Sequence, residues 1–150
     1  MKDSISLIGL VTLRLIDSNQ NIKKEIVIKN AITNYGRNMF AGRVQGTSPV
    51  APSHIGVGTG TQAFDPALTN LATQLHRQAL TRTLITTNVS NDTCRCTATI
   101  PAGTATGTLT EACLANVSTT GNMISYIAID PAIEKLVSDG LIITWDLISN

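Results

Sequence analysis

The feature that most constrains the fold is a series of short apolar, β-branched segments separated by turn-forming residues about every 8 to 12 positions. The first two segments lie in residues 5–30, on either side of the polar turn Asp17–Asn21. They predict a β-hairpin, because apolar side chains recur there at alternate positions. This hairpin, within residues 1–30, is a candidate arm projecting from the body. Further strands are predicted at residues 54–57, 77–89, 93–101, 108–117, 123–129 and 141–148.

This pattern predicts a mainly β protein, an antiparallel β-sandwich or barrel with an N-terminal β-hairpin. The length is that of one domain, so residues 1–150 are expected to form a single β-rich domain. Residues 31–43 interrupt the pattern, because their apolar side chains recur at about the spacing of an α-helix and predict one short helix. Asn30 or Thr33 would cap its start, and Gly42 would end it.

Three connecting segments complete the expected organisation. Residues 44–53 should form a surface loop, because Pro49 and Pro52 interrupt regular structure. Residues 68–75 are expected to hold one or two helical turns, and residues 131–140 to connect the last two strands.

The composition excludes several classes of function. Charged residues make up only 14% of the chain and its net charge is +1, so a basic face for nucleic acid is not expected. Aromatic residues make up 3%, too few for a platform that stacks bases or sugars. No stretch approaches the ~18 uninterrupted apolar residues of a membrane span, and Met1–Leu10 lacks a signal-peptide pattern. The odd number of cysteines fits synthesis in a reducing cytoplasm.

Candidate chemistry in the sequence is weak. Gly56, Gly58 and Gly60 match neither a dinucleotide-binding nor a P-loop pattern, so they predict a tight turn at a strand end, with Asp65 in the turn that follows. The pair Cys94 and Cys96 lacks the second ligand pair of a zinc site and is interpreted as two small buried hydrophobic residues. The sequence therefore predicts no enzyme activity, no cofactor and no metal, and makes a small-molecule substrate unexpected.

Glu111 is the most informative polar residue. Strand alternation places it on one face with Leu109, Cys113 and Ala115. If that face is the core, the buried carboxylate needs a partner. Arg77 is the predicted partner in a structural ion pair, Arg82 is a second candidate, and an acid site is the alternative interpretation.

Several motifs follow one another in order along the chain. They are Lys29–Gly36, His54-Ile-Gly-Val-Gly-Thr-Gly-Thr61, Ala67-Leu68, Leu75-His-Arg77, Gly107-Thr-Leu-Thr-Glu-Ala112, Gly121-Asn-Met123 and Leu141-Ile-Ile-Thr-Trp-Asp146. This ordered set resembles a family of bacteriophage virion structural proteins. The resemblance covers nearly the whole chain, although the family often has Gly where Cys113 stands and Phe near Ala115.

The resemblance implies a non-enzymatic virion component, made in the host cytoplasm, that forms a homo-oligomer and docks onto other virion proteins. A tail, baseplate or fibre-adaptor component is favoured, and a capsid decoration protein is the first alternative. A receptor- or carbohydrate-binding module is a further alternative. Docking is expected through the hairpin and the 44–53 loop, with Lys23, Lys24, Arg43, Pro49 and Pro52 as candidate contact residues.

Overall fold

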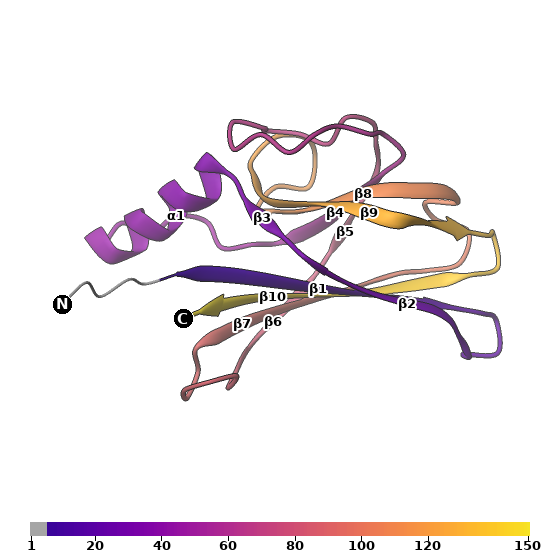
Figure 1. Ribbon diagram of the computed structural model, residues 1–150, viewed down its shortest axis with the longest axis horizontal. Helices are drawn as coiled ribbons and strands as arrows, with labels where there is room; N and C mark the ends of the chain where they lie inside the picture. The colour runs from indigo at the N-terminus through magenta and orange to yellow at the C-terminus, as the bar shows by residue number, and fades with distance from the viewer. Residues whose placement is uncertain (1–5) are drawn as a thin grey trace.

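A computed structural model describes residues 6–150 and shows two antiparallel five-stranded sheets packed against each other, as the sequence predicts (Figure 1). Sheet A has the strand order β2-β1-β10-β7-β6, and sheet B has the order β3-β9-β8-β4-β5. The strands are β1 (Leu7–Ile16), β2 (Ile22–Lys29), β3 (Ala31–Ile32), β4 (His54–Gly58), β5 (Gln74–Ala79), β6 (Thr81–Ile85), β7 (Thr93–Ile100), β8 (Gly107–Ala115), β9 (Met123–Lys135) and β10 (Gly140–Ser149).

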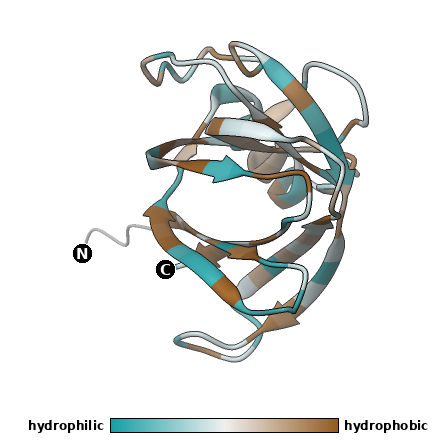
Figure 2. Cartoon of the chain, turned by 90° about the vertical axis from the view of Figure 1, so that its right-hand side faces the viewer, coloured by the Kyte–Doolittle hydropathy of each residue, from teal (hydrophilic) through white to brown (hydrophobic). Residues whose placement is uncertain are grey.

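The main core lies between the two sheets. Along β1, alternate side chains face inward, and Val11 and Leu13 are fully buried. Trp145 on β10 pairs with Val11 on the neighbouring strand β1 and is buried as well. Figure 2 shows the resulting alternation of hydrophobic and hydrophilic bands along the strands. Burial of each such large apolar side chain stabilises the fold by about 1.5–3 kcal/mol.

The predicted N-terminal hairpin forms, but it is not a projecting arm. Its first strand, β1, lies inside sheet A between β2 and β10. Its second strand is held to the body by Lys23, which forms an ion pair with Asp139, and by Lys24, which donates to the carbonyl of Ala132. An arm would leave the apolar side of β1 in water, so integration into the sheet is favoured. Residues 1–5, where the prediction begins, lie outside the described residues.

The single helix in the described residues, α1 (Asn34–Gln45), begins later than predicted. The predicted first residues instead form β3, which pairs with β9. Thr33, rather than Asn30, is the N-cap, and its hydroxyl accepts from the Gly36 amide at 3.1 Å. The helix continues past Gly42 and ends at Gly46, whose left-handed φ of 90° suits glycine.

Three connections differ from the sequence prediction. The segment predicted as one strand, 77–89, divides at Leu80, where the chain leaves sheet B as β5 and enters sheet A as β6. The helical turns predicted at 68–75 are absent, and β5 begins there instead. Much of the predicted connection 131–140 is strand, because β9 passes through Pro131 and continues pairing with the first residues of β8.

Candidate functional site

The motif centred on β4 leaves a strip without side chains on the outer face of sheet B. Ile55 and Val57 point into the core, while Gly56 and Gly58 alternate with them and face outward. A Cβ atom at Gly58 would lie 2.4 Å from the carbonyl oxygen of Thr73, so a side chain there would displace the backbone. Gly56 thus lies in the strand predicted at 54–57, and Gly58, which was predicted in the turn, extends that strand by one residue. Without side chains, both glycines allow another segment to approach closely.

Residues 59–73, here named the covering loop, pack against this strip and lie over sheet B (Figure 1). The two ends of the loop are close together near Gly60, where a Cβ atom would lie 2.6 Å from the Cβ atom of Ala72. Asp65 forms the predicted turn, since its side chain accepts from the Ala67 amide at 2.7 Å. The two ends of the loop also bond to each other, from the Thr59 amide to the Thr73 carbonyl at 3.0 Å.

Glu111 on β8 anchors the covering loop. Its carboxylate is fully buried and accepts backbone N–H groups from both loop ends. The distances are 3.2 Å from Gly60, 3.0 Å from Ala72 and 2.8 Å from Thr73. The neighbouring Thr110 hydroxyl donates to the Gly60 carbonyl at 2.6 Å. Hydrogen bonds to a carboxylate are stronger than neutral ones, so this group fixes the loop on the sheet.

A second hydrophobic cluster lies beneath the covering loop. Its members are Leu71 from the loop and Cys113, Met123 and Tyr126 from sheet B. The ring of Phe64 stacks on that of Tyr126, with centroids 6.3 Å apart. Burial raises the pKa of Tyr126 to about 12 and that of the Cys113 thiol to about 11. The loop is therefore packed as an accessory core.

The predicted ion pair between Arg77 and Glu111 is not formed. Arg77 is 8% exposed and donates to the Gln74 side chain at 2.7 Å and to the carbonyls of Val117 and Gly121 at 3.0 and 3.1 Å. Both residues face outward from sheet B, but each binds the backbone of a different loop. Arg82, the second candidate, instead donates to the carbonyl of Pro52. Backbone N–H groups thus satisfy the buried Glu111 carboxylate, whereas the Nη2 atom of Arg77 is buried without a hydrogen-bond partner.

An irregularity in strand pairing explains why simple alternation wrongly placed Glu111 on the same face as Leu109. The pairing of β8 with β9 shifts register between Leu109 and Glu111. Leu109 faces the main core, whereas Glu111 and Cys113 face the covering loop. Between the pair Leu109–Ile133 and the pair Glu111–Ala128, β8 advances two residues while β9 covers five, so the alternation of β8 is interrupted and Glu111 faces the other side.

The candidate docking residues mostly have partners within the chain. Lys23 and Lys24 hold β2, as described above. The Arg43 guanidinium donates to the carbonyl of Pro49 at 3.2 Å, which closes the segment after α1, and Pro52 is buried. The structure therefore shows internal contacts for these residues, and their role in docking stays a prediction.

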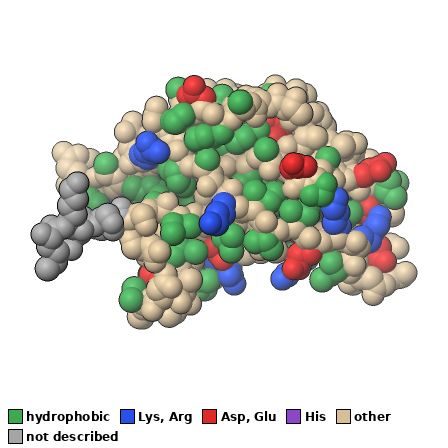
Figure 3. All heavy atoms as spheres, viewed as in Figure 1, with side chains coloured by type: hydrophobic (Ala, Val, Ile, Leu, Met, Phe, Trp, Pro, Cys, Tyr) green, Lys and Arg blue, Asp and Glu red, His purple; other side chains and the backbone are tan. Residues whose placement is uncertain are grey.

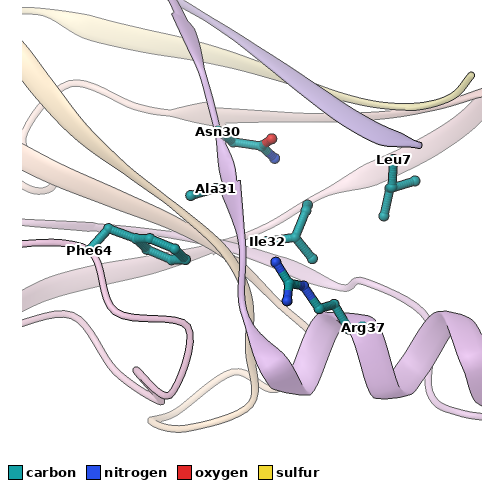
Figure 4. A pocket seen from close by; sticks show the side chains of 6 residues that line it. All are labelled: Leu7, Asn30, Ala31, Ile32, Arg37 and Phe64. Atoms are coloured by element: carbon teal, nitrogen blue, oxygen red, sulfur yellow. The ribbon is translucent and has the colours of Figure 1, made fainter.

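An open pocket of about 350 Å³ lies between α1, β3 and the covering loop (Figure 4). Arg37 is the charged residue in its lining, and Leu7, Ile32 and Phe64 form apolar walls. Both amide atoms of Asn30 are buried without a hydrogen-bond partner. They pack so closely on Gly9 that a Cβ atom there would lie 1.6 Å from the amide oxygen. Because these atoms are sealed from solvent, a molecule in the pocket would meet one guanidinium and apolar side chains.

Within residues 6–150, no three His, Cys, Asp or Glu side chains gather as a metal site would require. No helix in that range is both long and apolar enough to cross a membrane. A sugar site usually needs exposed aromatic faces, whereas Trp145 and Tyr126 are 0% and 2% exposed and belong to the two cores.

Comparison with known proteins adds no family assignment. No protein-family model, curated protein or solved structure matches this chain.

Proposed function

We propose that this chain is a non-enzymatic structural protein of a bacteriophage virion, which self-associates and docks onto other virion proteins after synthesis in the host cytoplasm. A tail or baseplate component, such as a fibre adaptor, is the favoured location. The sequence resemblance supports the proposal, and two of its motifs, His54–Thr61 and Gly107–Ala112, lie on the paired strands β4 and β8. The observation that carries it is a partly exposed apolar surface at the end of α1, where Leu7 and Phe40 are half-buried and Val44 is exposed.

This helix-end surface is formed by Leu7, Phe40 and Val44, with Arg37 and Arg43 beside them. Helix α1 extends away from the sandwich, and Val44 in its last turn is 91% exposed (Figure 1). The three apolar residues border a cleft of about 450 Å³. Apolar surface with a polar rim is typical of protein interaction sites. We propose that it receives an apolar segment of another copy of this chain, with the arginines facing acidic groups at the edge.

The remaining surface suits repeated weak contacts. Charged side chains are sparse on the face shown in Figure 3 and are interspersed with hydrophobic ones. A low density of charge reduces repulsion between copies. Many weak contacts in a symmetric assembly add up through avidity, so no single interface needs high affinity.

Sedimentation of the purified protein tests self-association. We expect the wild-type chain to form a discrete oligomer and Val44→Asp to weaken association at least about tenfold, or ~1.4 kcal/mol. Val137→Asp is the matched control, because Val137 is 67% exposed on the turn between β9 and β10, away from α1. A monomeric wild-type chain, or equal effects of the two substitutions, would contradict the proposed surface.

Copy number in intact particles tests the virion role. Quantitative mass spectrometry should find the chain in purified particles, with roughly a dozen copies in a tail ring. Hundreds of copies would instead favour capsid decoration, the alternative that the same exposed apolar surface permits. Absence of the chain from particles would overturn both.

A further inference from the structure

Two cysteines on β7 lie close together at the rim of the main core. Cys94 and Cys96 are alternate residues of the strand, so their side chains point to the same side. Their Sγ atoms are 4.0 Å apart. Cys96 is fully buried and Cys94 is half-buried. One sulfur is therefore reachable from solvent, and the second lies directly behind it.

The neighbouring strands β6 and β10 cover the two sulfurs to different extents. On β6, Leu84 pairs with Cys94 and is largely exposed, so the cover over the outer sulfur is thin. On the same strand, Arg82 pairs with Cys96. On β10, Trp145 pairs with Cys96 and is buried. The Cys94 thiol therefore lies near solvent at the edge of the core, and the Cys96 thiol lies inside the core.

The electrostatic surroundings favour a thiolate at the outer position. The hydrogen bond from Cys96 lowers the pKa of Cys94 to about 7, and the Arg82 guanidinium adds to this, while burial and Asp146 oppose it. The same hydrogen bond and burial raise the pKa of Cys96. Since the thiolate is the reactive form, Cys94 is the expected nucleophile.

We propose that Cys94 and Cys96 are a redox-active thiol pair that closes to a disulfide by exchange with a low-molecular-weight disulfide such as glutathione disulfide. The Cys94 thiolate attacks one sulfur of glutathione disulfide, whose S–S bond breaks and releases one glutathione thiolate. The Cys96 thiol then gives its proton to solvent, and its thiolate attacks the Cys94 sulfur and releases the second glutathione thiolate. The protein loses two protons and two electrons, and glutathione disulfide is reduced to two thiols.

The geometry allows this closure after a local adjustment. The two sulfurs must approach from 4.0 Å to a bond length of about 2.05 Å. Alternate Cα atoms of a strand are ~6.4–6.8 Å apart, at the upper end of the range that disulfides span, and the two Cβ atoms must come to within ~4.5 Å of each other, so β7 must bend between Cys94 and Cys96 for the bond to close. Trp145, the sole tryptophan, lies beside Cys96, so its fluorescence should report the change.

Intact-mass measurement after incubation of the native protein with glutathione disulfide tests the proposal. The wild-type chain should lose the mass of two hydrogen atoms without retaining glutathione, its Trp145 fluorescence should change, and a dithiol reductant should reverse both. The rate should rise with pH through about 7, as the Cys94 thiolate forms.

Single substitutions assign the two roles. Cys96→Ser and Cys96→Ala should each trap glutathione on Cys94, and two variants are used because a hydroxyl in the core can disturb folding. Cys94→Ser should react at no more than about a tenth of the wild-type rate. Cys113→Ser is the matched control and should behave as wild type, because Cys113 is buried under the covering loop. Stable glutathione on the wild-type chain, an inert native chain, or a fully reactive Cys94→Ser variant would overturn the proposal.

Discussion

Two carboxylates, Glu111 and Asp92, each accept three backbone N–H groups, yet they hold the molecule together in different ways. Glu111 is buried and binds segments that lie 38 to 51 positions away in the chain. Asp92 lies at the surface and binds the amides of its own turn, 3 to 5 positions away. The amides bound by Asp92 belong to Thr87, Asn88 and Val89.

The same pattern of three hydrogen bonds therefore contributes differently to stability, depending on how deeply the carboxylate is buried and on which segments it connects. If Asp92 is removed, water can reach the amides of the turn. If Glu111 is removed, the amides beneath the covering loop lose a partner that water does not readily replace, and each unsatisfied buried group costs about 1–3 kcal/mol. Glu111 should therefore support tertiary structure, whereas Asp92 shapes a local turn.

The largest expected effect is that of Glu111→Ala. It should lower the free energy of unfolding by about 3 kcal/mol or more, because it leaves the three loop amides unsatisfied. Urea denaturation followed by Trp145 fluorescence measures this change. Glu134→Ala, which removes an exposed glutamate from β9, is the matched control and should stay within about 0.5 kcal/mol of wild type. Equal losses of stability in Glu111→Ala and Glu134→Ala would show that the buried carboxylate has no special role in holding the covering loop.

Gly60→Ala should have the next largest effect. The new methyl group would lie 2.6 Å from the Ala72 Cβ atom and 2.7 Å from a Glu111 carboxylate oxygen, so the covering loop must move. We expect a loss of about 1–3 kcal/mol in the same denaturation measurement. Thr59→Ala tests an exposed neighbour in the same loop and should be close to neutral. A neutral Gly60→Ala would show that the loop is packed less tightly than described.

Asp92→Asn should lower the melting temperature less than Glu111→Ala does. The backbone hydrogen bonds, that of Val89 foremost, hold the pKa of Asp92 below its ordinary value. A carboxylate with a lowered pKa in the folded state stabilises it above the ordinary pKa of about 4, and this contribution is lost as the pH falls. The difference in melting temperature between wild type and Asp92→Asn should therefore narrow from pH 7 toward pH 3. A difference that widens toward acid would reverse the assigned sign.

The smallest effect concerns Tyr126 under the covering loop. In a Tyr35→Phe background Tyr126 is the remaining tyrosine, and its phenol should ionise near pH 12 in an ultraviolet titration, because burial raises its pKa. Adding Glu111→Gln should lower this pKa, since the nearby carboxylate charge also raises it. Circular dichroism establishes the pH range in which the fold persists. An ordinary tyrosine titration in the folded protein would show that the loop leaves the ring in water.

Much of the architecture could be predicted from the sequence, because strand alternation and turn-forming residues are local signals. The sandwich, the hairpin of β1 and β2 and the start of β4 followed from them. The switch between sheets at Leu80 and the continuation of β9 through Pro131 did not, because partner strands distant in the sequence determine them. The extension of α1 to Gly46 likewise depends on which of two glycines adopts the left-handed conformation.

Only part of the candidate site could be predicted from the sequence. The burial of Glu111 was predicted, but its partners were not, because backbone N–H groups carry no sequence signal and Arg77 offered an obvious opposite charge. The irregular strand pairing near Thr110 also reversed the expected facing of Leu109 relative to Glu111. One signal was present and would have helped: in Ile55–Gly58, apolar residues alternate with glycine, which is typical of a strand whose outer face is covered at close range.

Amide hydrogen exchange, measured residue by residue, tests most directly whether the buried Glu111 carboxylate holds the covering loop on sheet B. In the wild-type protein the amides of Gly60, Ala72 and Thr73 should be protected. In Glu111→Gln these three amides should exchange much faster, while those of β1 and β10 keep their protection. Unprotected loop amides in the wild type, or protection unchanged by the substitution, would contradict the account.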